Sequence, residues 1–385
     1  MGAPMFAPAP APASASASGP LPPFGSDVTP RQVAPAAGPA PVAPAAPAPQ
    51  PAAATAAVAP LPPGVAGSGV GGAAAGAYAG MKTNNPDPLL NAASQLVYQL
   101  MHASLVYGCV DWCVGIFKTG CGIDTVVVSN EGAGYIPPGV FVPRSTRMLF
   151  ADTGLTETFQ ARWFGWVNPA QTMLAYASLI GDHDPNVELY ALAVSTDHGG
   201  SSLAARDAGV PHYEDCSLLT SPIRPEAEPM PLDEMHVHRL QTVDAAECAR
   251  LIRMTVPEAQ QRDASWATTR DAVQTALNRA SSLLGLEVPP VIRHVLSALD
   301  RGELVSDEQW DDLEFARFNA TLDSASQRAG RRADEVISPH ARASHNLARV
   351  AELLRMWRHG PNYCDIAYEA GQIAIEARLW PSNGV

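Results

Sequence analysis

Apolar side chains follow two different patterns along this chain, and the change falls near residue 85. Over residues 1–80 large apolar side chains are sparse, and Pro recurs every second to fourth residue through much of the segment. Pro removes backbone donors and fixes φ near the polyproline II value, so a helix does not form there. The few apolar groups cannot offset the entropy of ordering about eighty residues at about 1 to 2 kcal/mol each. The pattern predicts a disordered Ala/Pro/Gly-rich N-terminal tail over residues 1–84.

From residue 85 onward, apolar positions recur at the spacing of helices and strands. A helix is predicted after the turn at residues 85–88, because Leu89, Leu96 and Leu100 share one helix face. Short apolar runs bounded by Gly and Pro predict strands that alternate with further helical segments. This alternation predicts a small α/β (α+β) domain over residues 85–240. Its other elements are strands at 125–128, 139–142, 187–195 and 210–213, and helices from 168 and over 201–208.

After residue 241 the strand pattern stops and only helical spacing remains. Ser306 and Gln309 have the spacing of a capping box, and Pro339 follows Ser338 at a first helical position. The sequence therefore predicts an all-α helical bundle over residues 241–385, with acidic and Arg-rich outer faces. The predicted helices are 244–254, 257–284, 290–300, 307–329, 339–358 and 363–379.

The net negative charge of the chain indicates which classes of partner it can bind. The 385 residues carry a formal net charge of -13, and the two charged side chains of residues 1–80, Asp27 and Arg31, cancel. The negative charge therefore belongs to the predicted domains. It disfavours nucleic acid and anionic membrane surfaces as partners and favours another protein.

Several features indicate a soluble cytoplasmic protein. The most apolar window, residues 103–117, is too short to cross a bilayer and contains Asp111. The N-terminus lacks the basic and continuous apolar regions of a signal peptide. The six Cys residues follow no disulfide-framework spacing, so reduced thiols are expected. Only Lys82 and Lys118 among the 25 basic residues are Lys, which is typical of a high-GC bacterium.

Reactive side chains concentrate in residues 182–238. Asp197, His198, His212 and Cys216 are the candidates for catalysis there, because His and carboxylate groups can hold a hydrolytic metal and a neighbouring imidazole can activate a thiol. The segment contains no HExxH or CxxC spacing, and Cys is among the most buried residue types. We therefore assign no catalytic residue, metal or cofactor, and keep a hydrolase or metal-dependent effector as one alternative.

Three segments resemble one known family. They are PLPPFGSD at residues 20–27, VSNEGAGYIPPGV at residues 128–140 and LAVSTDHGG at residues 192–200. Together they look like the Ala/Pro-rich EspK-type proteins of mycobacterial ESX (type VII) secretion systems. The resemblance covers about residues 20–385 and is strongest over 125–240.

The resemblance implies a cytosolic accessory or chaperone-like adaptor without catalytic residues. Such a protein binds a secreted substrate, EspB-like in the best-known case, or a component of the secretion machine. A second alternative is that the chain is itself an exported ESX substrate. Tyr107 and Asp111 have the YxxxD spacing of such substrates, but no WxG turn precedes them.

Overall fold

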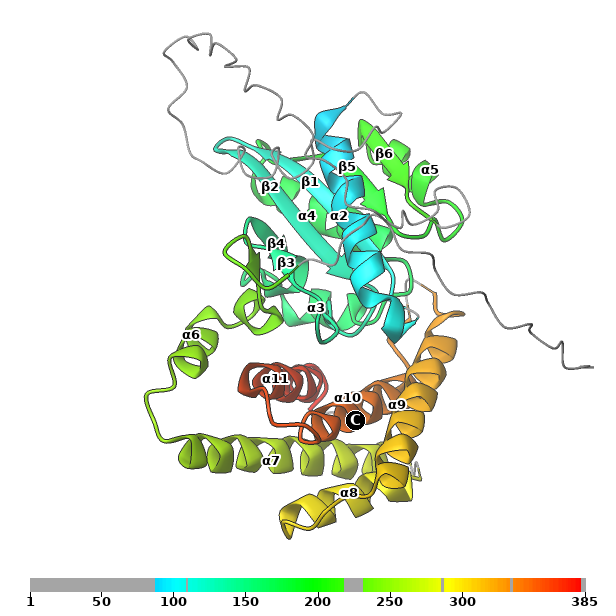
Figure 1. Ribbon diagram of the computed structural model, residues 1–385. Coiled ribbons are helices and arrows are strands. Elements are labelled where there is room, and N and C mark those ends of the chain that lie inside the picture. Colours follow the sequence, from blue (N-terminus) through cyan, green and yellow to red (C-terminus); the bar gives the residue numbers. More distant parts are fainter. Residues whose placement is uncertain (1–86, 109, 218–230, 285–286, 333–334, 382–385) are drawn as a thin grey trace, which may run out of the picture. The chain divides into compact units, whose positions relative to one another are not determined.

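The computed structural model describes residues 87–381 except 109, 218–230, 285–286 and 333–334 (Figure 1). The predicted tail over residues 1–84 therefore lies outside the described residues. Within them a mixed sheet with its helices comes first and a series of helices follows, which confirms the predicted fold class. All described residues belong to one compact unit. The domain boundaries after residues 84 and 240 stay predictions.

The sheet has five strands in the order β4-β2-β1-β5-β6. The central strand β1 (Trp112–Thr119) pairs antiparallel with β2 (Gly122–Ser129) on one side and with β5 (Glu188–Val194) on the other. The edge strands β4 (Thr146–Met148) and β6 (His212–Asp215) run parallel to β2 and β5 respectively. The sheet is therefore mixed.

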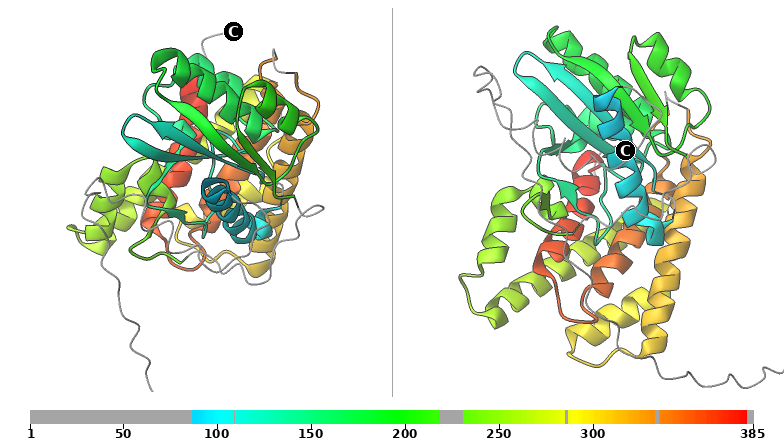
Figure 2. Two further views of the ribbon diagram at one scale, coloured as in Figure 1. Left: turned by 90° about the horizontal axis from the view of Figure 1, so that it is seen from above. Right: turned by 45° about the horizontal axis from the view of Figure 1, so that its top comes forward.

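Successive side chains of β1 enter two different apolar layers. Trp112 and Val114 pack in the layer that contains α2 (Pro88–Ser104), whereas Cys113 packs in the layer that contains α4 (Pro169–His183). This is the alternation that a strand imposes on neighbouring side chains. α2 and α4 therefore cover opposite faces of the sheet (Figures 1 and 2). The smaller helices of this part are η1 (Leu105–Tyr107), η2 (Leu149–Ala151), α3 (Glu157–Trp163) and α5 (Ser201–Asp207).

Several strands differ from the sequence-based expectation. β1 is absent from the predicted strands because both its faces are buried, so it reads as a continuous apolar run without alternation. The strand predicted at 139–142 is reduced to β3 (Val142–Pro143), which pairs with β7 (His236–Val237). The Pro residues at 137, 138 and 143 cannot donate to a ladder, and this limits pairing to two residues.

The helical part centres on α10 (Pro339–Arg355), in which every residue from 341 to 354 is buried. The predicted capping box is confirmed: Ser306 Oγ accepts the Gln309 backbone N–H at 3.2 Å, and Gln309 Oε1 accepts the Ser306 N–H at 3.0 Å. Among the helices of the described residues, none combines the length and hydropathy that a membrane span requires. The remaining helices are η3 (Arg239–Thr242), α6 (Ala245–Arg253), α7 (Glu258–Leu284), α8 (Pro290–Asp300), α9 (Asp307–Arg328) and α11 (Tyr363–Leu379).

Candidate functional site

A buried ion pair connects the sheet to α9. Glu131, in the loop after β2, is 4% exposed and accepts a hydrogen bond from Arg328 at the end of α9, and its other oxygen lies 3.6 Å from His345 Nδ1. Arg328 also donates to the backbone carbonyls of Asn130 and Gly165. Burial alone would raise the pKa of Glu131, but Arg328 and His345 lower it to about 2. The carboxylate is therefore charged at neutral pH and holds α9 against this loop.

A second buried cluster fixes α10 and α11 against the same loop. Arg239 donates from Nε to Asp365 Oδ1 and from Nη1 to Glu369 Oε1, both at 2.7 Å. Tyr135 donates to the same Glu369 oxygen at 2.6 Å, and Arg349 Nη1 lies 3.8 Å from the other oxygen. Burial raises the pKa of Glu369 in spite of Arg239 and Arg349. Arg239, Tyr135, Arg349 and Glu369 are buried and Asp365 is partly buried, so the cluster positions the helices.

On the opposite side of α9 a row of large apolar side chains faces solvent. Phe315 is 65% exposed, Phe318 48% and Leu322 40%. Their spacing of three and four residues places them on one helix face, while Trp310 and Leu313 are buried on the other face. We call Phe315, Phe318 and Leu322 the α9 stripe. Contiguous exposed apolar surface of this kind marks sites of interaction with other proteins.

A cavity of about 630 Å³ lies beside the α9 stripe, between α8, α9 and α10. Its walls combine apolar side chains with three carboxylates and contain neither Lys nor Arg. Phe315 belongs both to the stripe and to the cavity wall. We call the cavity the acidic groove; its lining residues are Glu287, Pro289, Pro290, Val291, His294, Gln309, Asp312, Phe315, Ala316, Asn319, Ala320, Asp323, Ser344 and Leu347.

The three carboxylates of the acidic groove differ in their partners. Asp323 accepts hydrogen bonds from His340 Nε2, at 2.6 Å, and from the Ser344 hydroxyl, so it connects α9 to α10. Glu287 and Asp312 form no ion pair with any described residue. Their negative charges are thus available to a basic group that enters the groove.

Three of the four candidates from residues 182–238, Asp197, His198 and His212, each have a different polar partner. The Asp197 carboxylate accepts the Ser201 backbone N–H at 2.9 Å at the start of α5. His198 Nε2 lies 3.0 Å from Asp111 Oδ2. Asp111 also accepts hydrogen bonds from the hydroxyls of Ser195, at 3.1 Å, and Thr196, at 2.7 Å, and so orders the segment after β5.

The other two candidates lie against α2. His212 Nε2 is 3.5 Å from Asp87 Oδ2, and its ring packs on Tyr190. Cys216 is fully buried, and burial raises its pKa to about 12. Within the described residues, no hydrogen bond or ion pair joins any two of the four candidates. None of them lines the acidic groove. The prediction that assigns them no catalytic role, and the hydrolase alternative, both stay untested.

The α9 stripe is the feature that the sequence-based interpretation misses. The predicted helix over 307–329 is nearly the observed one, but its outer faces are expected to be acidic and Arg-rich. Phe315, Phe318 and Leu322 already have the spacing of one helix face in the sequence. Their spacing alone does not tell which face is buried, and the contacts with α8 and α10 decide that.

Comparisons with known proteins give one family match. A family model described as the EspK C-terminal domain matches residues 103–335, which include the sheet and the α9 stripe. No curated protein matches the chain. Among solved structures, the chain is similar to a fragment of the conserved hypothetical protein Rv3899c (residues 184–410) from Mycobacterium tuberculosis. That match has 13% sequence identity and a TM-score of 0.37, and it covers 75% of this chain and 95% of the other.

Proposed function

The chain belongs to the family of the EspK C-terminal domain, which links it to proteins associated with ESX secretion, and from this we propose that it is an accessory protein that binds a secreted ESX protein. The proposed binding surface is the α9 stripe together with the acidic groove. The family is not one of enzymes, and the role proposed here involves no chemical step.

The observation that carries the proposal is the exposure of the α9 stripe next to the groove. Covering the exposed parts of two Phe side chains of about 200 Å² each, at about 25 cal/mol per Å², favours a complex by about 6 kcal/mol. The cost of association reduces this gain. Phe315 and Phe318 would therefore act as anchors, as aromatic side chains often do in protein interfaces.

The charges around the groove indicate the chemistry of the partner. Glu287 and Asp312 favour Lys or Arg, and the apolar walls favour aliphatic or aromatic side chains. An amphipathic helix with a basic edge combines the two and binds in a groove through residues one helical turn apart. We propose that such a segment of an EspB-like secreted substrate occupies the groove, and that binding takes place in the cytoplasm.

Binding measurements on the full chain test the proposal. Purified substrates of the cognate ESX system are titrated against the wild-type chain and against Phe315→Ala/Phe318→Ala. We expect the double variant to bind at least tenfold more weakly, which equals about 1.4 kcal/mol. Ile252→Ala on α6 is the matched control, because Ile252 is 66% exposed but lies outside the stripe. It should bind like the wild type.

The charge of the groove gives a second, independent result. Asp312→Arg should weaken binding of a basic segment, and added salt should weaken wild-type binding more than that of the Arg variant. Equal affinities of the wild type, Phe315→Ala/Phe318→Ala and Asp312→Arg for every substrate would contradict the proposal. Detection of the chain in culture filtrate would contradict the proposal that it binds its partner in the cytoplasm.

A further inference from the structure

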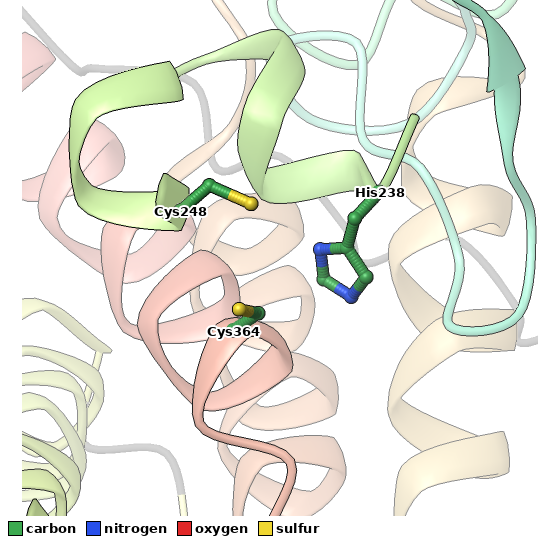
Figure 3. A group of neighbouring side chains, drawn as sticks. All are labelled: His238, Cys248 and Cys364. Atoms are coloured by element: carbon green, nitrogen blue, oxygen red, sulfur yellow. The ribbon is translucent and has the colours of Figure 1, made fainter. Parts of the chain in front are cut away.

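Three side chains that commonly bind metals converge in the core of the helical part. His238, Cys248 and Cys364 are all buried, and one ligand atom of each lies within 4.8 Å of the others (Figure 3). They come from three separate segments: His238 precedes η3, Cys248 lies on α6, and Cys364 lies in the first turn of α11. We infer that these three residues bind one zinc ion, and this inference is independent of the proposed function.

The orientation of His238 suits a metal ligand. Its Nε2 lies 3.0 Å from Asp365 Oδ1, and Asp365 is in turn held by Arg239. Its Nδ1 accepts the Leu240 backbone N–H at 3.1 Å, so that nitrogen carries no proton, and zinc would take the lone pair that now accepts this hydrogen bond. The ring turns the Nδ1 edge toward the two sulfur atoms (Figure 3). A carboxylate that holds the second ring nitrogen is typical of zinc-binding His residues.

The set of donors fits zinc in type and size. Zinc binds Cys sulfur at about 2.3 Å and His nitrogen at about 2.0 Å in a tetrahedron, which places the donors about 3.5 to 3.8 Å apart. The observed upper limit of 4.8 Å requires the side chains to close by at most about an ångström. Water completes the fourth position. On binding, each thiol releases its proton to solvent, so Zn²⁺, two thiolates and a neutral imidazole form an uncharged buried group.

Zinc would fix α6, a helix with few packing neighbours, to better packed parts of the chain. Among the described elements, α6 packs mainly on η3, which directly follows His238, and on α11, which carries Cys364. The ion would fix α6, and with it the start of α7, against the N-terminal end of α11. A disulfide between Cys248 and Cys364 would use the same two sulfurs but would need an oxidant.

Metal content of the full chain tests the inference. The chain is purified with zinc supplied, dialysed and analysed by mass spectrometry for metals. We expect about one zinc ion per chain in the wild type and less than about a fifth of that in Cys248→Ser and His238→Ala. Cys113→Ala is the matched control, because Cys113 is equally buried but lies in β1, and it should retain the metal.

A measurement on the wild type alone keeps the inference falsifiable if the variants unfold. Titration of the metal-free chain with cobalt(II) should produce the thiolate-to-metal absorption band of a Cys-ligated ion, and zinc should raise the melting temperature by mass action. Zinc content that is unchanged in both site variants would overturn the inference. So would the lack of the cobalt band, or a Cys248–Cys364 disulfide found by peptide mapping of the non-reduced chain.

Discussion

Replacing Arg328 by Met removes the guanidinium group that compensates a buried carboxylate. Glu131 is 4% exposed, and Arg328 is its partner at the end of α9. The variant also takes a hydrogen-bond donor from the carbonyls of Asn130 and Gly165. His345 remains near Glu131 but lies 3.6 Å away. We expect the free energy of unfolding to fall by about 3 to 5 kcal/mol, the usual effect of leaving one member of a buried ion pair alone.

The pKa of Glu131 gives a similar magnitude. It is about 2 in the folded chain and 4.5 for an unperturbed Glu, a difference worth about 3 kcal/mol. Because the folded pKa is lowered, this stabilisation is complete above pH 4.5 and is lost as the pH falls toward 2. The difference between Arg328→Met and the wild type should therefore shrink over the same range, since protonated Glu131 no longer needs a cation.

Urea unfolding followed by Trp fluorescence measures these differences at pH 7 and pH 3. Arg328→Met combined with Glu131→Gln should recover about half of the lost stability, because no uncompensated charge remains. The control is Arg301→Met, which breaks the exposed pair with Glu303 and should have no measurable effect. If Arg328→Met lowers the free energy of unfolding at pH 7 by less than about 1 kcal/mol, the reasoning is refuted, because an exposed ion pair contributes no more than that.

Two further predictions concern the sheet and its thiols. Gly115→Ala in β1 should lower the free energy of unfolding by about 1 to 3 kcal/mol in a urea titration, because the added Cβ would lie 2.9 Å from Met173 Sδ. Gly120→Ala is the control: its Cβ would enter open space, so the stability should not change. A thiol reagent at pH 7 should label the exposed Cys121 within minutes, but Cys216 only after unfolding. Rapid labelling of Cys216 in the folded chain would contradict this and favour the thiol-nucleophile alternative.

Helices of this chain are predictable because their signals are local. The capping box of Ser306 and Gln309 and the Pro at position 339 act within one turn, and the predicted bounds of α7 to α9 agree with the observed ones within one residue. β1 is not predictable in the same way. Both its faces are buried, so its residues carry no alternation, and its role as central strand depends on β2 and β5.

The candidate sites likewise depend on contacts between distant segments that local signals do not show. The sequence shows a cluster of His, Asp and Cys over residues 182–238, but the side chains of that cluster bond to partners such as Asp111 and Asp87. His238 belongs to the cluster, yet its neighbours Cys248 and Cys364 come from other helices. Neighbours in sequence and neighbours in space coincide only within a helical turn or a strand pair, so spacing alone does not identify a site assembled from three elements.

The sequence by itself determines the order of an α/β part before a helical part and the acidic charge, because composition and short-range periodicity carry this information. The resemblance to the EspK family rests on three short segments of the sequence, at residues 20–27, 128–140 and 192–200. Only the tertiary structure decides that Phe315 and Phe318 face solvent and that Glu131 is buried against Arg328. Which face of a helix is covered depends on which elements pack against it. That packing brings together residues nearly two hundred positions apart in the chain, such as Glu131 and Arg328. A local sequence pattern carries no information on the interaction energy of such a distant pair.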